Sequence, residues 1–334
     1  MAIFRRKTKM KFRLFRAFAF SILSTLVWCQ GAIAQGYPTR PVQIVVPYAA
    51  GSADTVARIL AAQLNAQTGA TFIVENRPGA SGEIGAGIVA QSAPDGYTLL
   101  MTTDAITLLP SIMKSMPFNV QKDLVPVTLV GKTEGSFLVV NDALPVHNLQ
   151  ELIAYAKDPS HRLVYGSSGL SSAAHLRMAV LAKAMNFPAQ HIPFKGLGDA
   201  MTALLGGEVQ TMFVISTGAI PLINAGKIRA IAYDNPTRSP LLPNVPTLVE
   251  SGVPPSPVSS SWDGLFVPAG TPAPVVAWLA AQIHEAVNNP ATAAKLKKLG
   301  VTPVASTPAD FKTTLTVYFT AMANAVAAAG MTPQ

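Results

Sequence analysis

Cysteine is almost absent from this sequence. Among 334 residues there is one, Cys29, and it lies in an N-terminal segment that we expect to be removed. A mature chain without cysteine suits an oxidising compartment. It also excludes disulfide bonds, thiol catalysis and metal sites built from thiolates.

Histidine is sparse as well, and no pair of histidines has the spacing of a metal site. The five residues are His147, His161, His175, His191 and His284. The phosphate-binding pattern G-x-x-x-x-G-K-[ST] does not occur. Residues 85–90 match G-x-G-x-x-A, but they follow a polar turn rather than a strand, and an exported protein seldom uses a dinucleotide. We therefore expect no metal and no cofactor.

Excess positive charge is confined to the N-terminus. The formal charge is +8, and seven of the positive residues lie between Arg5 and Arg16. Subtracting these seven from +8 leaves +1 for the rest of the chain. A nucleic-acid-binding function therefore loses its electrostatic basis.

The basic segment opens a secretory signal peptide. An apolar run follows at residues 18–28, and Ala32-Ile33-Ala34 precedes Gln35. We predict a signal peptide over residues 1–34, with cleavage after Ala34. A single membrane anchor is the alternative, but the run is shorter than the roughly 20 apolar residues that a spanning helix needs. No later run approaches that length.

From Tyr37 onward, short apolar segments alternate with helical patterns. This alternation is typical of an α/β protein with mostly parallel sheets flanked by helices. The predicted strands are residues 42–46, 72–75, 98–102, 127–130, 137–141, 163–165, 210–215, 228–233 and 262–267. The predicted helices are residues 53–67, 84–91, 173–185, 200–205, 274–288, 292–299 and 309–329, with another that begins at Asn148.

The first strand runs into a loop of small residues, and we call residues 48–54 the first loop. Ser52 is the predicted N-cap of the helix that follows. The first N–H groups of that helix have no partner in it, and small side chains let an anion approach them. We interpret the loop as half of a carboxylate site. The alternative is an ordinary strand-to-helix turn, of which every α/β protein has several.

The same pattern recurs at residues 165–172, which we call the second loop. A short strand leads into Gly166-Ser167-Ser168-Gly169-Leu170-Ser171-Ser172, and a helix follows. This loop offers backbone N–H groups and hydroxyls to an acidic group, without a base for chemistry. Two such loops would suit two lobes that close on one ligand.

Three side chains in this part of the chain leave alternatives open. Ser171 lies in a stretch close to a nucleophile elbow, so a secreted serine hydrolase is an alternative. Ala173 stands where the elbow has glycine, and the loop is rich in serine, which disfavours that function. His175 could reach a ligand or be a structural histidine. Lys195 could supply a point charge to a ligand carboxylate or be solvated.

A series of motifs along the mature chain resembles the Bug family, the Bordetella-uptake-type solute-binding proteins of tripartite tricarboxylate transporters. The motifs are Tyr37-Pro38-Thr39-Arg40-Pro41, Pro47-Tyr48-Ala49-Ala50-Gly51, Asp54-Thr55-Val56-Ala57-Arg58, Glu75-Asn76-Arg77-Pro78-Gly79-Ala80, Pro94-Asp95-Gly96-Tyr97, Tyr165-Gly166-Ser167, His191-Ile192-Pro193-Phe194-Lys195-Gly196, Gly226-Lys227-Ile228-Arg229-Ala230, Val245-Pro246-Thr247 and Gly264-Leu265-Phe266-Val267-Pro268-Ala269-Gly270-Thr271-Pro272.

The resemblance implies a periplasmic two-lobe binding protein of the type II-like class, each lobe a mostly parallel sheet flanked by helices. Lobe 1 would comprise residues 35–138 and 262–334, and lobe 2 residues 139–261. Two hinge strands near residues 137–141 and 261–267 would join them. In the family, backbone N–H groups of two strand-to-helix loops and ordered water hold a ligand carboxylate.

The resemblance thus predicts a monomeric, non-enzymatic receptor for a dicarboxylate, an acidic amino acid or an aromatic acid. It would deliver this acid to the membrane permease subunits of a tripartite tricarboxylate transporter, or signal to a membrane two-component kinase. The predicted ligand-binding residues are Tyr48, Ala49, Ala50, Gly51, Ser52, Asp54, Thr103, Asp104, Tyr165, Gly166, Ser167, Ser168, Gly169, Ser171, Ser172, His175, Lys195 and Ser216. Thr102 and Thr217 are further contacts for the ligand tail.

Overall fold

The computed structural model describes residues 36–133, 135–170, 172–255, 261–331 and 333. The predicted signal peptide, its cleavage site and Ser171 lie outside the described residues, as does the side chain of Thr217. The chain divides into two units, residues 1–39 and 40–334. Everything below concerns the second unit.

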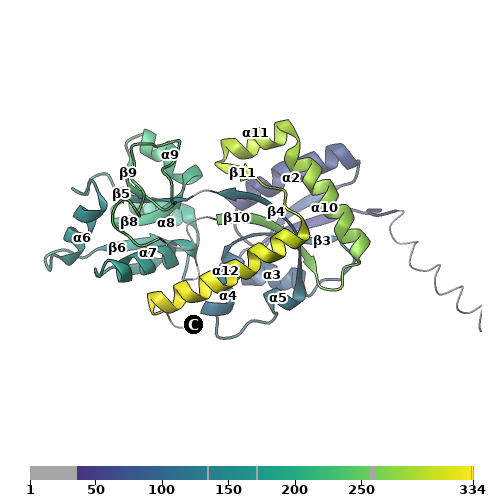
Figure 1. The fold of residues 1–334 in the computed structure, drawn as a ribbon, viewed down its shortest axis with the longest axis horizontal. Coiled ribbons are helices and arrows are strands. Elements are labelled where there is room, and N and C mark those ends of the chain that lie inside the picture. The colour runs from purple at the N-terminus through teal and green to yellow at the C-terminus, as the bar shows by residue number, and fades with distance from the viewer. Residues whose placement is uncertain (1–35, 134, 171, 256–260, 332, 334) are drawn as a thin grey trace, which may run out of the picture. The chain divides into compact units, whose positions relative to one another are not determined.

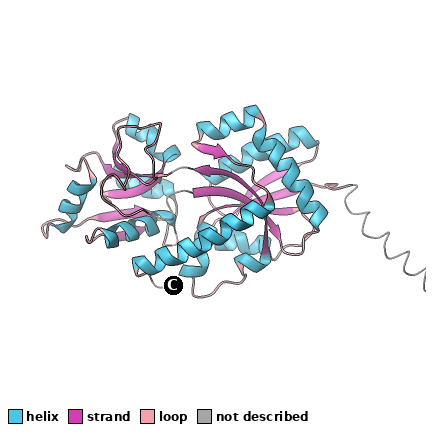
Figure 2. Ribbon diagram, in the orientation of Figure 1, coloured by secondary structure: helices cyan, strands magenta, loops and turns pink. Residues whose placement is uncertain are grey.

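One sheet has six strands in the order β11-β4-β10-β3-β1-β2 (Figures 1 and 2). Strand β1 is parallel to β2 and β3, whereas β10 is antiparallel to both β3 and β4. Strand β11 is antiparallel to β4. The bounds are β1 Val42–Val46, β2 Phe72–Asn76, β3 Thr98–Thr103, β4 Leu124–Thr133, β10 Ser261–Pro268 and β11 Val301–Pro303.

The other sheet has five strands in the order β7-β6-β8-β5-β9. Strand β6 is parallel to β7 and β8, and β5 is antiparallel to β8 and β9. The bounds are β5 Ser136–Asn141, β6 Val164–Ser167, β7 Gln190–Pro193, β8 Thr211–Ile215 and β9 Ile228–Tyr233.

Both sheets are therefore mixed, and the expectation of mostly parallel sheets was wrong. All the antiparallel pairs except that of β11 with β4 involve a strand that follows a passage from one sheet to the other. Strand β5 comes directly after β4 has left the six-stranded sheet, and β10 returns to that sheet after β9. Strands without a helical crossover are free to pair in the antiparallel sense.

Helices flank both sheets (Figure 2). Their bounds are α2 Ser52–Thr68, α3 Glu83–Ala90, α4 Ala105–Ile112, α5 Val120–Asp123, α6 Leu149–Lys157, α7 Ala173–Ala184, α8 Leu197–Leu205, α9 Ser216–Asn224, α10 Ala273–Asn288, α11 Pro290–Lys298 and α12 Pro308–Ala329, with a 3-10 turn η1 at Ala80–Gly82. Helix α2 begins at Ser52 with Gly51 as N-cap, so Ser52 is not the cap that we predicted.

Each sheet has its own apolar core, and one cluster joins the two lobes. In that cluster, Leu176 of α7 packs with Leu108 of α4 and Met322 of α12. Figure 1 shows α12 running past α4 towards α7. In the part of the chain that the structure describes, no helix is both long and apolar enough to cross a membrane.

Candidate functional site

The first loop joins β1 to α2 and is held by Tyr48. The Tyr48 hydroxyl lies 3.0 Å from Thr102 Oγ1 and 3.2 Å from Thr103 Oγ1, at the end of β3. The Asn76 side-chain amide donates to the carbonyl of Tyr48 at 3.0 Å. Burial raises the pKa of Tyr48, so the phenol is neutral. The predicted proximity of the β3 threonines to the first loop is confirmed.

Asp54 supports the first loop from within α2. Its side chain is buried, and its carboxylate accepts hydrogen bonds from Arg58 Nε at 3.0 and 3.1 Å. Arg58 also donates to the side-chain oxygen of Asn76 at 3.0 Å. A carboxylate with these partners orients the loop, while Ala49, Ala50 and Gly51 are the exposed part.

A tight turn at residues 79–82 lies between the two loops, and we did not predict this position. A Cβ atom added at Gly82 would lie 3.0 Å from the Tyr48 ring. A Cβ atom added at Gly169 would lie 3.5 Å from Ser81 Oγ. The turn therefore lies close to the first loop on one side and to the second loop on the other.

Serine hydroxyls shape the second loop from inside. Ser167 Oγ and Ser172 Oγ each donate to the carbonyl of Gly169 at 2.8 Å. The N–H of Gly169 donates back to Ser167 Oγ at 3.2 Å. We expected these hydroxyls to face a ligand; instead both bond within the loop. The N–H groups of Ala173 and Ala174, at the start of α7, have no acceptor within that helix.

Two stacked histidines lie beneath the second loop. The imidazoles of His175 and His191 are 3.7 Å apart with an 8° angle between their planes. His175 Nδ1 lies 2.8 Å from the Tyr165 hydroxyl, and His191 Nε2 lies 2.7 Å from Ser167 Oγ. Burial lowers the pKa of both histidines to about 4, with His175 adding to the shift of His191. Both rings are therefore neutral at pH 7.

The Ser167–His191 contact does not have the arrangement of a nucleophile and its base. Ser167 is fully buried, and the single hydrogen of its hydroxyl is donated to the carbonyl of Gly169. His191 Nε2 must then donate to Ser167 Oγ rather than accept from it. This geometry favours a structural role for both side chains.

Acidification should destabilise the fold through this stack. The pKa of each histidine is lower in the folded protein than the usual 6.5, so the unfolded chain binds more protons between pH 6.5 and 4. We expect the contribution of this stack to the free energy of unfolding to fall as the pH falls through that window. In His191→Gln the fall should be shallower, as measured by urea denaturation at pH 7, 5.5 and 4.5. His284→Gln, at an exposed histidine of α10, is the matched control and should keep the wild-type slope.

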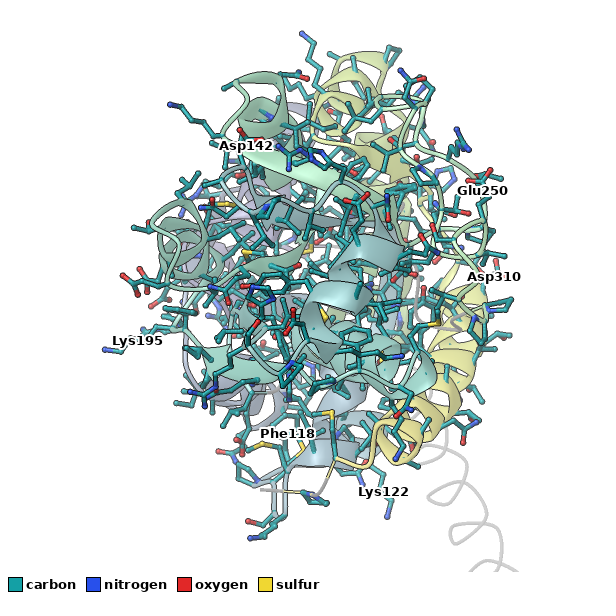
Figure 3. The ribbon with its side chains drawn as sticks, turned by 90° about the vertical axis from the view of Figure 1, so that its left-hand side faces the viewer. Phe118, Lys122, Asp142, Lys195, Glu250 and Asp310 are labelled. Carbon is teal, nitrogen blue, oxygen red and sulfur yellow. The ribbon has the colours of Figure 1, made fainter. Side chains whose placement is uncertain are left out.

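The remaining predicted ligand-binding residues differ in how far they are buried. Gly166 is buried, Ser168 is half-buried, and Ser216 is buried where α9 follows β8. Lys195 is exposed, and Figure 3 shows it extending away from the ribbon into solvent. That position favours a solvated lysine.

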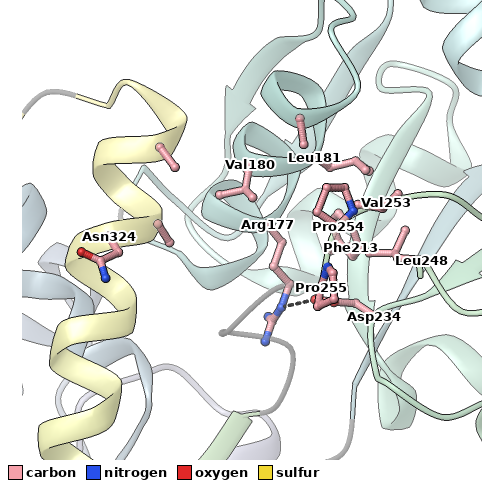
Figure 4. Close-up of a pocket in the computed structure, with 13 residues that line it drawn as sticks. Arg177, Val180, Leu181, Phe213, Asp234, Leu248, Val253, Pro254, Pro255 and Asn324 are labelled. Carbon is pink, nitrogen blue, oxygen red and sulfur yellow. Dashed lines mark ion pairs between the residues drawn. The ribbon is translucent and has the colours of Figure 1, made fainter.

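A cavity of about 250 Å³ lies elsewhere (Figure 4). Its walls come from α7, from residues near β8 and β9, and from α12. It is lined by Arg177, Val180, Leu181, Ala184, Phe213, Asp234, Leu248, Val253, Pro254, Pro255, Asn324, Ala325 and Ala328. None of the predicted ligand-binding residues lines this cavity, so the cavity is separate from the two loops.

Comparison with known proteins shows that the chain belongs to one family. Residues 56–316 match the model of the tripartite tricarboxylate transporter family receptor. The chain is 37% identical over 278 residues to protein BugT of Bordetella pertussis, an alignment that covers 82% of this chain and 85% of BugT. These matches confirm the resemblance to the Bug family.

Solved structures agree with that assignment. A protein of R. palustris with adipate superimposes with a TM-score of 0.83 at 30% identity, covering 89% of this chain and all of that one. MatC of Rhodopseudomonas palustris with bound malate gives a TM-score of 0.79 at 29% identity, covering 87% of this chain and all of MatC. The predicted two-lobe α/β class is confirmed, with mixed sheets.

Proposed function

The chain belongs to the tripartite tricarboxylate transporter receptor family of periplasmic binding proteins, and from that premise we propose that it captures a small carboxylate between its two lobes. The observation that carries this proposal is the pair of strand-to-helix loops that meet across the turn at residues 79–82. The structures of relatives with adipate and with malate support a carboxylate ligand.

The chemistry of the loops suits a carboxylate held mainly by N–H groups. The first N–H groups of α2 and α7 lie at the carboxyl ends of β1 and β6, where helix dipoles favour negative charge. The side chains around them, Tyr48, Thr103 and His175, are uncharged at pH 7. The ligand would therefore be recognised by hydrogen bonds rather than by a buried cation.

The proposal also covers export of the protein, the bounds of its lobes and delivery of the ligand. Cleavage after Ala34 would release the mature chain into the periplasm. Lobe 1 would comprise residues 35–138 and 262–334, with lobe 2 between them. The loaded protein would pass its acid unchanged to the permease subunits of a tripartite tricarboxylate transporter.

Thermal shift with a panel of acids tests this function. The protein starting at Gln35 would be melted with adipate, malate, aspartate, glutamate and benzoate, each against sodium chloride of equal ionic strength. An acid at 100 times its Kd adds about 2.7 kcal/mol of stability. For a chain of this length that raises Tm by about 5 °C. A panel without any shift, or consumption of the acid, would contradict the proposal.

A further inference from the structure

Four buried charged side chains lie where the two sheets meet, outside the loops described above. We call them the junction cluster: Arg177 of α7, Asp234 after β9, Asp104 after β3 and Asp263 of β10. None is more than 7% exposed. Charged groups are rarely buried unless they are paired, so this cluster requires an explanation.

Arg177 acts on carboxylates that belong to both sheets. Its Nε lies 3.0 Å from Asp234 Oδ2, an ion pair visible in Figure 4. Burial raises the pKa of Asp104, and the positive charge of Arg177 opposes that shift. The Ser261 hydroxyl donates to Asp104 Oδ1, while Oδ2 has no hydrogen-bond partner among the described residues.

Each half of the junction cluster is attached to one of the candidate loops. Arg177 lies in α7, whose N-terminus carries the second loop. Asp104 directly follows Thr102 and Thr103, which hold Tyr48 of the first loop. A change in the separation of the two loops therefore moves Arg177 relative to Asp104.

The charges of the junction cluster do not balance. The cluster contains one guanidinium and three carboxylates. The charge of Arg177 acts on Asp234 and Asp104, but no cation is among the groups that shift the pKa of Asp263. Burial raises the pKa of Asp263 to about 7, and the negative charge of Asp104 adds to the shift. Tyr48, which lies near Asp104, is neutral, and Lys132 of the neighbouring strand β4 is exposed. An unpaired buried carboxylate is costly, so the assembled cluster keeps a proton on Asp263.

We propose that Arg177 is a positioning residue for lobe closure: it holds Asp234 of one lobe in an ion pair and attracts Asp104 of the other lobe through its charge. In this proposal, closure assembles the junction cluster with one bound proton. The inference rests on the proposed function, since closure over a ligand is what would assemble the cluster. Closing then takes up a proton. Ligand affinity should fall as pH rises towards 7, by up to tenfold per pH unit, and level off above 7.

The proton can be tested without any ligand by urea unfolding of the wild type and Asp263→Asn at pH 5 to 9. A carboxyl with a folded pKa near 7 and an unfolded pKa near 4 loses its stabilising effect as pH rises from 4 to 7. The ratio of the wild-type to the variant unfolding constant should grow up to tenfold per pH unit between pH 5 and 7, then stay level. A ratio that is constant from pH 5 to 9 would overturn the claim that the folded protein keeps a proton on Asp263.

Closure is tested by small-angle scattering of the ligand-free protein at pH 5.5 and 8. We expect the wild type to have the smaller radius of gyration at pH 5.5, Arg177→Met to be expanded at both pH values, and Arg177→Lys to follow the wild type. Arg238→Met, which removes an exposed ion pair with Glu250, is the control and should behave as the wild type. Equal radii in all four proteins would overturn the role of Arg177. Because neither test uses a ligand, failure to find an acid would count against the proposed function alone.

Discussion

Valine in place of Gly169 is expected to weaken ligand binding about 100-fold without unfolding the protein. Gly169 has φ of +129°, a conformation that residues with a side chain rarely adopt. Such strain costs about 1–3 kcal/mol, and the upper figure corresponds to roughly 100-fold in affinity. The peptide would move to relieve the strain. Its carbonyl is the shared acceptor of Ser167 and Ser172, so both ends of the second loop would move with it.

Calorimetric titration with the acid identified by the thermal shift panel would measure this loss. Gly207→Val is the matched control, because Gly207 also has a positive φ, of +79°, but has no atom within 4 Å of an added Cβ. The control should lose some stability and keep its affinity. Wild-type affinity in Gly169→Val would show that the second loop does not hold the ligand.

The regular part of the fold was predictable because its strands are short apolar runs. The predicted strand at residues 228–233 coincides with β9, and that at residues 210–215 starts one residue before β8. Helices α4 and α9 were missed, since each contains a proline that is unfavourable inside a helix. Strand β7 was missed because Gln190–Pro193 is partly exposed and lacks an apolar run.

The candidate site was predictable where small residues mark a loop, and where a strand was expected to end beside that loop, as with Thr102 and Thr103. Both loops were found from their small residues. The hydrogen bonds of Tyr48 to β3 and the stacking of His175 on His191 depend on the tertiary fold. The junction cluster left a weak signal that we did not use: Arg177 stands on a largely apolar helix and Asp263 in an apolar strand. Neither residue reveals its partner without coordinates.

Alanine in place of Phe311 should cause the largest loss of stability that we predict. Phe311 of α12 is fully buried, with its ring centre 5.1 Å from that of Trp262 and 5.0 Å from that of Phe266. Removing a buried phenylalanine ring costs about 3–5 kcal/mol. The ring packs over β10, the strand by which the chain returns from the five-stranded sheet. Urea denaturation of the ligand-free protein would measure the loss.

The Phe311 ring fits against β10 because Gly264 beneath it has no side chain. A Cβ atom added at Gly264 would lie 2.3 Å from Phe311 Cζ, so Gly264→Ala overpacks the site and should cost about 1–3 kcal/mol. In the double variant, the alanine methyl occupies part of the space that the ring leaves. The two losses should therefore sum to about 1–2 kcal/mol more than the loss in the double variant. Additive losses would mean that Gly264 is required for the backbone of β10 rather than for the approach of Phe311.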